Sequence, residues 1–457
     1  MKLRWLGLWY LTWGQILPSF PPAKAQWISL PEFLQAVRQN ALVVRQSATA
    51  LRPAQMDAFQ ASANFLPSLS ASATATQNYG TTFDPFAFQR IQRTTTFSSF
   101  SLSANWVLFA GLANHYLLRQ AKAGIAAAQS AYRRTEAEVL TQALLQFSQV
   151  LSDSITLTLS LQRLSRLQTQ IQRSRALVLA GQALPLDTLS LSAQIAREEA
   201  QYLALYNRHR ENKLALLQLM GRENLSPDEV EFHLGLTIPD LPPLSEEEAI
   251  RQALQFAPEL EEARWRLLQQ QYAVRLSRAG HFPTLSLSAS IQTNYSSNAG
   301  RIIGFNPNTQ SFITERIPFS DQLRENLNQS VFLSLSVPIF RQFRQVQQRV
   351  RAEAALESAE YQALLQKQQV IRRTEQAYLA WRNALQQEQA LQRSMEAARL
   401  AYLQAQQQYE AGRLSYWNYQ EALLSFSQAE LELQQARLEK ALRILLLNAY
   451  LGKYSDL

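Results

Sequence analysis

Four segments of the chain alternate between apolar and small polar residues with a period of two. They cover residues ~68–79, ~98–109, ~284–295 and ~329–340. In the first segment, Leu69 and Ala71 alternate with Ser70 and Ser72, and Phe332 interrupts the pattern in the fourth. A period of two puts the apolar and polar sets on opposite faces of a strand, and about ten residues suffice to cross a bilayer as a tilted strand. The pattern therefore predicts four membrane β-strands.

The remaining pattern is helical. Residues 112–180 contain no Pro and a single Gly, and residues 341–411 contain neither. Apolar residues recur every seven positions in both, which favours coiled-coil packing. At ~1.5 Å per residue, the first of these helices would be about 100 Å long. Shorter helices are predicted over residues 29–65, 187–220, 245–281 and 415–450, so that two short helices in series match one long helix.

The chain contains two copies of one plan. An offset of 216 relates Pro67 to Pro283, and an offset of 231 relates Gly181 to Gly412. The offset changes once, so a single insertion explains the difference. Insertions are tolerated in exposed loops, and we expect irregular loops in both halves at this point. These loops are residues 80–98 and 296–330.

Residues 1–25 have the layout of a cleaved secretory signal. Lys2 and Arg4 precede an apolar run of about thirteen residues, which is too short for a membrane anchor, and the run is followed by Ala23-Lys24-Ala25. Removal of this segment lowers the formal net charge from +8 to +5. The basic balance therefore gives little support for an anionic partner, and no nucleic-acid partner is predicted. No later stretch is apolar enough to predict a transmembrane helix.

Composition excludes several kinds of chemistry. There is no Cys, so disulfides, thiolate metal ligands and a thiol nucleophile are excluded. The four His are scattered and never spaced three or four residues apart, which argues against a metal site. No catalytic or phosphate-binding motif is present. We therefore predict no enzyme activity, no cofactor and no metal.

The four strands cannot close a barrel alone. The same alternation is compatible with the half-buried sheet of a soluble domain, but four matched segments behind an export signal favour membrane strands. An open strand edge in lipid leaves backbone groups unpaired, at several kcal/mol each. Bacterial barrels have even strand numbers from eight upwards. The chain is thus expected to assemble, with eight strands in a dimer or twelve in a trimer.

These features together resemble the TolC-type outer-membrane efflux family. The resemblance rests on the export signal, the duplicated helix–strand–strand–long helix–helix plan, and residues 411–422, which read AGRLSYWNYQEA. It implies a mainly α fold with a membrane β-barrel. Three chains would complete a 12-stranded barrel in outer-membrane lipid, continued by a periplasmic α-helical barrel. It also implies a homotrimer that meets a periplasmic adaptor (a membrane fusion protein) and an inner-membrane pump.

The implied domain plan has four parts. They are a signal peptide (1–25), a first efflux repeat (26–221), a non-helical belt linker (222–244) and a second efflux repeat (245–457). The implied location is the outer membrane of a Gram-negative-type bacterium, with extension into the periplasm.

The resemblance also implies site residues at the two helix turns. The adaptor-contacting tips correspond to Gly181, Gln182, Ala183, Leu184 and Pro185, and to Gly412, Arg413, Leu414 and Ser415. The periplasmic gate candidates are Asp187, Asn418 and Glu421. Asp187 has an equally good reading as a first-turn acid that complements the helix dipole, and Arg413 can be read as an exposed turn residue. Asn418 stands where the family often has Asp. The neighbouring Tyr416, Trp417 and Tyr419 are expected to pack.

Three functions account for parts of this pattern. The favoured one is a passive exit duct of a tripartite efflux or type I secretion system. The alternative is a structural or adhesive coiled-coil protein of the cell envelope, which explains the heptads but neither the four strands nor the matched helix lengths. A third is an outer-membrane enzyme, which would need a nucleophile beside His281, the one histidine close to a predicted strand.

Overall fold

The computed structural model describes residues 26–84, 89–92, 94–181, 184–235, 244–307 and 311–452. They form two compact units. One unit takes in residues up to 49, 130–261 and 365 onwards, and the other takes in residues 50–129 and 262–364. The expected signal peptide, Gln182, Ala183 and part of the expected belt lie outside the described residues.

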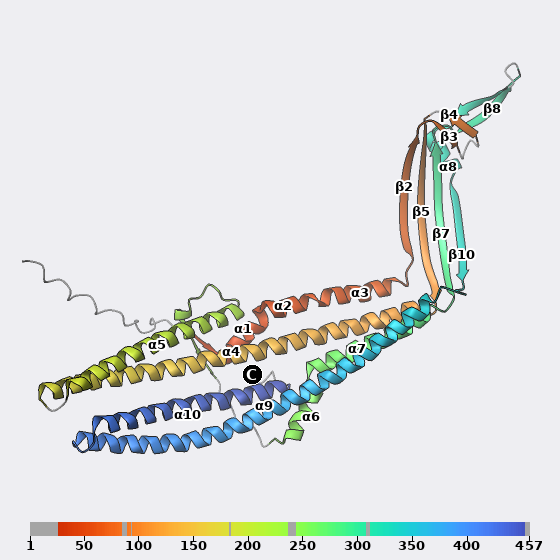
Figure 1. Cartoon of the computed structure of the whole chain (residues 1–457). Helices are drawn as coiled ribbons and strands as arrows, with labels where there is room; N and C mark the ends of the chain where they lie inside the picture. Colours follow the sequence, from red (N-terminus) through yellow and green to blue (C-terminus); the bar gives the residue numbers. More distant parts are fainter. Residues whose placement is uncertain are drawn as a thin grey trace, which may run out of the picture. The chain divides into compact units, whose positions relative to one another are not determined.

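A four-stranded antiparallel sheet dominates the second unit (Figure 1). Its order is β10-β7-β5-β2. The strands are β2 (Ser68–Asn78), β5 (Thr95–Ala110), β7 (Thr284–Ser296) and β10 (Asn328–Ser336). The two repeats therefore join at the β5–β7 pair. Within the described part of the chain, β2 and β10 each pair along one side only, so both outer edges carry unpaired backbone groups.

The two faces of this sheet differ as the alternation predicts. On one face, hydroxyls pair across strands, with oxygen–oxygen distances of 2.8 Å for Ser70 and Ser103 and 2.6 Å for Thr74 and Ser99. On the other face, large apolar side chains stand exposed, and the exposed fraction of Leu69 reaches 72%. A sheet whose two faces separate hydroxyl from hydrocarbon is suited to water on one side and lipid on the other.

The loops at the far end of the sheet are more regular than expected. They form the hairpins β3 (Thr81–Asp84)–β4 (Gln89–Gln92) and β8 (Gly300–Asn306)–β9 (Ser311–Arg316), followed by helix α8 (Phe319–Glu325). Buried Gln322 secures α8, because its Oε1 accepts from the Ser296 N–H at 2.9 Å and its Nε2 donates to the Ile317 carbonyl at 2.9 Å. The prediction of irregular loops was wrong, since such local hydrogen bonds leave no periodic signal.

The fourth strand is shorter than its predicted range of ~329–340. Strand β10 ends at Ser336, two residues before Pro338. Proline has no backbone N–H to donate, so it ends pairing in a ladder. Beyond the strand, Gln342 and Phe343 have positive φ angles of 51° and 58°, at the positions that an offset of 231 relates to Gly111 and Leu112 (φ 60° and 66°). Both repeats thus turn from strand to long helix through two successive left-handed residues.

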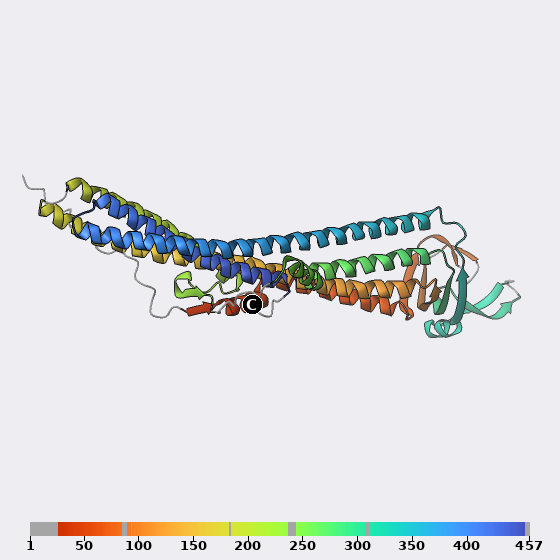
Figure 2. The same cartoon turned by 90° about the horizontal axis from the view of Figure 1, so that it is seen from below.

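The helices after the strands repeat with matching lengths. Helices α4 (Ala113–Leu179) and α9 (Arg344–Glu410) each have 67 residues, and α5 (Pro185–Leu219) and α10 (Tyr416–Tyr450) each have 35. Their first and last residues keep the same offset of 231 that relates the two turn glycines. The turns between α4 and α5 and between α9 and α10 both lie in the first unit, and each pair of helices runs side by side towards its turn (Figure 1, Figure 2).

The leading helices are broken, which the sequence-based prediction missed. The predicted helix 29–65 is divided into α1 (Leu30–Asn40), α2 (Leu42–Thr49) and α3 (Leu51–Ala63). The predicted helix 245–281 is divided into α6 (Glu246–Phe256) and α7 (Pro258–Ala279). Ala257 has ψ 117° because the residue before a proline is forced out of the helical region. Pro53 in the first turn of α3 cannot donate a helical hydrogen bond, which favours the earlier boundary.

The break after α1 lies beside the end of a helix that is distant in sequence. Ala41, which the offset of 216 relates to Ala257, is also extended, with ψ 122°, although no proline follows it. At the end of α5, a Cβ added to Gly221 would lie 3.2 Å from the Asn40 Cβ. At the end of α10, a Cβ added to Gly452 would lie 2.5 Å from the Phe256 Cβ. In both repeats the leading helix therefore breaks beside the end of the returning helix.

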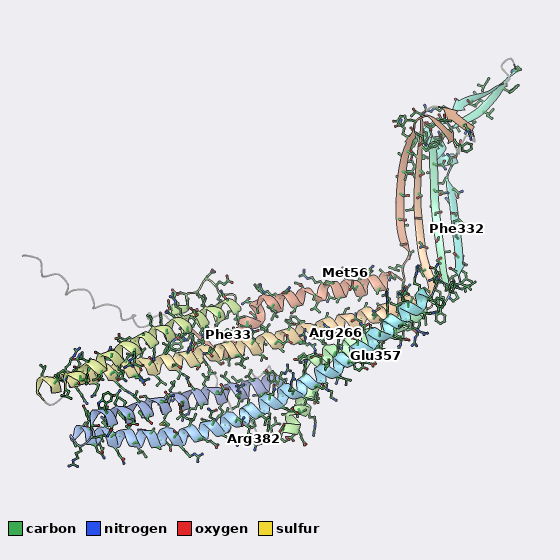
Figure 3. All side chains as sticks on the ribbon, in the orientation of Figure 1. Phe33, Met56, Arg266, Phe332, Glu357 and Arg382 are labelled. Atoms are coloured by element: carbon green, nitrogen blue, oxygen red, sulfur yellow. The ribbon has the colours of Figure 1, made fainter. Side chains whose placement is uncertain are left out.

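The core of the first unit lies around a short parallel strand pair, β1 (Gln26–Ser29) and β6 (Val230–His233). Phe33, Phe147 and Phe232 pack together with ring centroids 5.1 to 6.1 Å apart, and Figure 3 labels Phe33. The expected non-helical belt contains β6 and the short 3-10 helix Pro227–Glu229, so it is not wholly without helix. Among the described helices, none combines the length and the hydropathy that a bilayer span requires.

Candidate functional site

The long helices α4 and α9 both end just before a glycine, where the chain turns into the next helix. Gly181 and Gly412 have φ angles of 72° and 70°, which glycine adopts without strain. At the second turn, the Gly412 N–H donates to the Tyr409 carbonyl at 3.0 Å and the Arg413 N–H donates to the Gln408 carbonyl at 2.8 Å. These two bonds form a Schellman motif, which satisfies the last carbonyls of α9. A Cβ added at either glycine would meet nothing within 4 Å.

The helices that follow the turns place the gate candidates. Pro185 opens α5, and the Ser415 Oγ caps α10 by accepting from the Asn418 N–H at 3.4 Å. Asp187 and Asn418 consequently occupy the same third helical position. The side chains of Asn418 and Glu421 are exposed. The side chains of Asp187 and Tyr416 lie outside the described residues.

Most of the described tip residues are exposed. Leu184 is 67% exposed, and Arg413 is also exposed, as its reading as a turn residue implies. Leu414 is half-buried and Ser415 is exposed. Trp417, which was expected to pack, is 64% exposed. A bare apolar and cationic tip of this kind is accessible to a second protein.

The α9–α10 hairpin is closed by a ladder of aromatic rings. Tyr409 stacks on Tyr419 with centroids 4.9 Å apart, and Tyr402 stacks on Phe426 at 5.3 Å. Tyr402 also lies 6.0 Å from Tyr419. Burial and a hydrogen bond with Tyr402 raise the pKa of the Tyr419 hydroxyl, so Tyr419 stays neutral. The expectation that Tyr419 packs is confirmed.

The α4–α5 hairpin is held by aliphatic packing and ion pairs. Leu167, Ile171 and Leu191 form a buried cluster near its turn. Arg163 on α4 pairs with Glu198 on α5 at 3.2 Å between Nη2 and Oε1. Each hairpin is therefore joined internally by contacts that exclude water or pair charges across its two helices.

Near the turns, polar contacts join one hairpin to the other, whereas farther away Leu438 on α10 and Val150 on α4 belong to one buried apolar cluster. The Nε2 of Gln420 on α10 donates to the Oε1 of Gln194 on α5 at 3.4 Å. The guanidinium of Arg166 on α4 lies 3.4 Å from the Ser427 Oγ and 3.9 Å from a Glu430 carboxylate oxygen, both on α10. We call this set of five side chains the hairpin seam: Arg166, Gln194, Gln420, Ser427 and Glu430. Its polar contacts lie at the long end of the hydrogen-bond and ion-pair ranges, so they are individually weak.

A buried polar cluster lies farther from the turns. The Asp153 carboxylate, 1% exposed, accepts from Arg208 at 2.7 Å and from the Asn212 side chain at 2.7 Å. Burial, with the nearby charge of Lys213, lowers the pKa of His209 to about 4. Lys213 itself pairs with Glu231 at 2.7 Å. His209 is therefore neutral at pH 7 and Asp153 is fully hydrogen-bonded, as in a structural ion-pair network.

The site predictions and the structure agree only in part. The predicted turn glycines lie at the turns, and Asn418 and Glu421 lie on the first turns of α10. The structure does not bring the described gate candidates into contact with one another. Sequence reasoning missed the hairpin seam, because Gln and Arg are frequent all along these helices. It also missed the ring partners of Tyr419, Tyr402 and Tyr409, because they lie on a different helix. Within the described ranges, no group of His, Asp and Glu side chains could hold a metal ion.

Comparison with solved structures identifies the fold. VceC from Vibrio cholerae, an outer membrane protein, matches with a TM-score of 0.75 and 18% identity over 93% of this chain and 96% of that chain. The Campylobacter jejuni CmeC outer membrane channel matches with a TM-score of 0.76 and 15% identity, over 93% and 85% of the two chains. The open state of the Neisseria gonorrhoeae MtrE outer membrane channel matches with a TM-score of 0.74 and 16% identity, over 93% and 88%. At these identities the similarity establishes the fold.

Sequence comparisons establish the family. A search of curated proteins found no significant match. The family model described as outer membrane efflux protein matches twice, over residues 33–222 and 249–453, which confirms the tandem repeat. Its members are channel proteins and not enzymes, in agreement with the absence of catalytic motifs from the sequence. The duplicated helices and strands, the matched channel folds and the two family-model matches lead to one conclusion: the chain belongs to the outer membrane efflux protein family and is an outer-membrane channel protein.

Proposed function

We propose that the protein is the passive exit duct of a tripartite efflux or type I secretion system. The observation that carries the proposal is the four-stranded sheet, with hydroxyls on one face and hydrocarbon on the other. Among the described strands, its outer edges on β2 and β10 have no pairing partner. Such a sheet is stable in lipid only when its edges are paired. The hydroxyl face would then line a water-filled pore.

Three copies meet this requirement. Twelve strands form an even-numbered barrel of a size that leaves an aqueous lumen. The structure is compatible with a trimer because β2 and β10 lie at opposite edges, so that β2 of one copy can pair with β10 of the next. Helices α4, α5, α9 and α10 would continue the duct into the periplasm.

The helix turns are proposed as the meeting point with the other components. Residues 181–185 and 412–415 would contact the periplasmic adaptor, because their described members other than Leu414 are exposed and the second turn presents Arg413. The inner-membrane pump would supply the energy, since the duct itself has no catalytic motif. Asp187, Asn418 and Glu421 would form the polar rim of the periplasmic opening.

Opening is proposed to separate the two hairpins along the hairpin seam. Each hairpin is joined internally by buried rings, aliphatic side chains or a short ion pair, whereas the seam contains long polar contacts. Polar contacts can exchange protein partners for water at little cost in free energy, and apolar contacts cannot. Near the turns, separation of the two hairpins is therefore favoured over the opening of a hairpin. Farther from the turns, Leu438 and Leu442 on α10 share a buried apolar cluster with Val150 and Leu151 on α4, so this part of the interface would stay closed.

Cross-linking tests this proposal, and the Cys-free chain gives a clean background. A bis-maleimide joining cysteines in Gln194→Cys/Gln420→Cys should lock the seam and abolish export. The matched control, Arg163→Cys/Glu198→Cys, joins two helices of the same hairpin and should leave export intact. Normal export with the seam locked would refute the proposed opening. Absence of any single-channel conductance in a planar bilayer would instead favour the adhesive coiled-coil alternative.

The cargo class needs a separate measurement. Deletion of the gene, followed by a toxicity panel and a comparison of secreted proteins, distinguishes the two kinds of system. Increased sensitivity to small toxic compounds indicates efflux. Loss of particular extracellular proteins indicates secretion.

A further inference from the structure

A mostly exposed aromatic side chain, Phe332, stands on the hydroxyl face of the sheet. In strand β10, Phe332 lies directly opposite Ser288 of β7, in the register that also pairs Ser330 with Ser290 and Ser334 with Ser286. Its neighbours two residues away on the same face are thus serines. The ring is 61% exposed, and Figure 3 labels it on β10. Phe332 therefore rises from a surface of small hydroxyls.

The row of residues that ends at Phe332 is otherwise polar. The Ser288 Oγ donates to the Asn105 side-chain oxygen at 3.0 Å, and the Ser68 Oγ donates to the Asn105 backbone carbonyl at 3.2 Å. The register places Ser68, Asn105, Ser288 and Phe332 in one line across the four strands. Phe332 therefore has no apolar neighbour within this row of one chain.

The internal duplication shows that the fold does not need a ring here. The offset of 231 relates Phe332 to Ser101 in β5, which occupies the corresponding place on the same face. The Ser101 hydroxyl pairs with that of Ser72 at 2.8 Å. The first repeat is thus built with serine where the second has phenylalanine. Because Phe332 is mostly exposed within one chain, the folding of that chain gains little free energy from its burial.

A second ring on this face has a different setting. Phe97 in β5 faces the same side as Thr76 and Ser99, but it is half-buried. It pairs with Ser296, eight residues along β7 from the partner of Phe332. At ~3.4 Å per residue the two positions are about 27 Å apart along the strands. Phe332 is therefore a separate and more accessible feature.

We propose that Phe332 is a cargo-contact residue of the pore. Its ring would bind planar aromatic molecules, and would bind aromatic cations most strongly. The proposal rests on the trimeric duct proposed above. Threefold symmetry would place three Phe332 rings at one height on the pore wall. A phenyl face attracts other rings and cations through its quadrupole, whereas the surrounding hydroxyls interact with water and small ions. The three rings would therefore be a contact that selects aromatic cargo on a wall made mostly of small hydroxyl side chains.

Planar-bilayer recording of the purified full-length protein tests the proposal. The probe is ethidium, a planar aromatic cation, and tetraethylammonium is the non-aromatic cation for comparison. Current block is measured relative to the unblocked current of each variant. Phe332→Ser, which introduces the first-repeat residue, should weaken ethidium block about fivefold and leave tetraethylammonium block unchanged. Phe332→Trp should keep or strengthen ethidium block.

A matched control removes an exposed ring that lies outside the four strands. Phe340 is 70% exposed and follows β10, and Phe340→Ser should not change ethidium block. Equal ethidium block in the wild type and Phe332→Ser would overturn the assignment of Phe332, as would an equal change for both cations. If the wild type forms no channel, the duct itself is refuted, and that result is distinct from a conducting channel that is indifferent to Phe332.

Discussion

Arg166 provides the sharpest test of how the duct opens. Its guanidinium joins α4 to α10 through Ser427 and Glu430, and it lies three residues from Arg163, which joins α4 to α5 through Glu198. The two arginines therefore share a helix and a chemistry but act on different interfaces. Arg166→Gln should weaken the hairpin seam, and Arg163→Gln should weaken a single hairpin.

The size of the effect follows from the geometry of the seam. The Arg166 and Glu430 side chains are 39% and 31% exposed and 3.9 Å apart, and the bond to Ser427 is 3.4 Å long. A partly exposed ion pair and a long hydrogen bond together contribute about 1 kcal/mol. If three protomers open together, the loss is about 3 kcal/mol, or roughly a 150-fold rise in the open-to-closed ratio. If they open independently, the rise is about fivefold for each.

Open probability in planar bilayers measures this ratio directly. Arg166→Gln should raise the open probability and should sensitise cells to large hydrophilic antibiotics that enter through a leaking duct. Arg163→Gln leaves the mostly buried Glu198 unpaired, so it should lower the thermal stability and leave the open probability unchanged. An Arg166→Gln duct that gates like the wild type, or an Arg163→Gln duct that leaks as much, would refute the role of the seam.

Three further predictions concern stability. Gly111→Ala should reduce trimer yield and Tm far more than Gly412→Ala. Both sites have positive φ, so each substitution costs about 1 kcal/mol of backbone strain. At Gly111 the new Cβ would in addition lie 2.5 Å from the Phe282 Cβ, whereas at Gly412 it would meet nothing within 4 Å. Asp153→Asn should lower the unfolding free energy by about 2 kcal/mol in chemical denaturation, because it weakens the charge-assisted hydrogen bonds that the buried carboxylate accepts from Arg208 and Asn212; an unchanged transition would contradict this. The depressed pKa of His209, about 4, means that the unfolded chain takes up a proton first as the pH falls below 6.5. Stability should be lost between pH 6.5 and 4, and His209→Gln should show a smaller loss of Tm over that interval.

Local features of the fold follow from the sequence because their causes lie within a few residues. The alternation of Leu69 and Ala71 with Ser70 and Ser72 sets the two faces of β2, since the pleat of a strand is a local property. Gly181 and Gly412 end their helices because the left-handed conformation is nearly free for glycine. Even the break at Ala257 was readable from Pro258.

The break at Ala41 was not readable in the same way. No proline follows Ala41. The break at the corresponding Ala257 of the second repeat shows only that the repeated fold tolerates a break at this position. The contact of Asn40 with Gly221 joins opposite ends of the first repeat. Periodicity within one helix carries no information on which distant helix end will lie beside it.

Sequence by itself determined the duplicated plan, the two faces of the strands, the turns and the family resemblance, because each depends on spacing along the chain. Only the tertiary structure decided which side chains join separate helices, where Gln194 meets Gln420 and Arg166 meets Glu430, and that β1 pairs with the distant β6. It also showed that Phe332 stands on the hydroxyl face opposite Ser288. These partners depend on packing between elements far apart in sequence, and a heptad or an alternating strand specifies its face but not its neighbour.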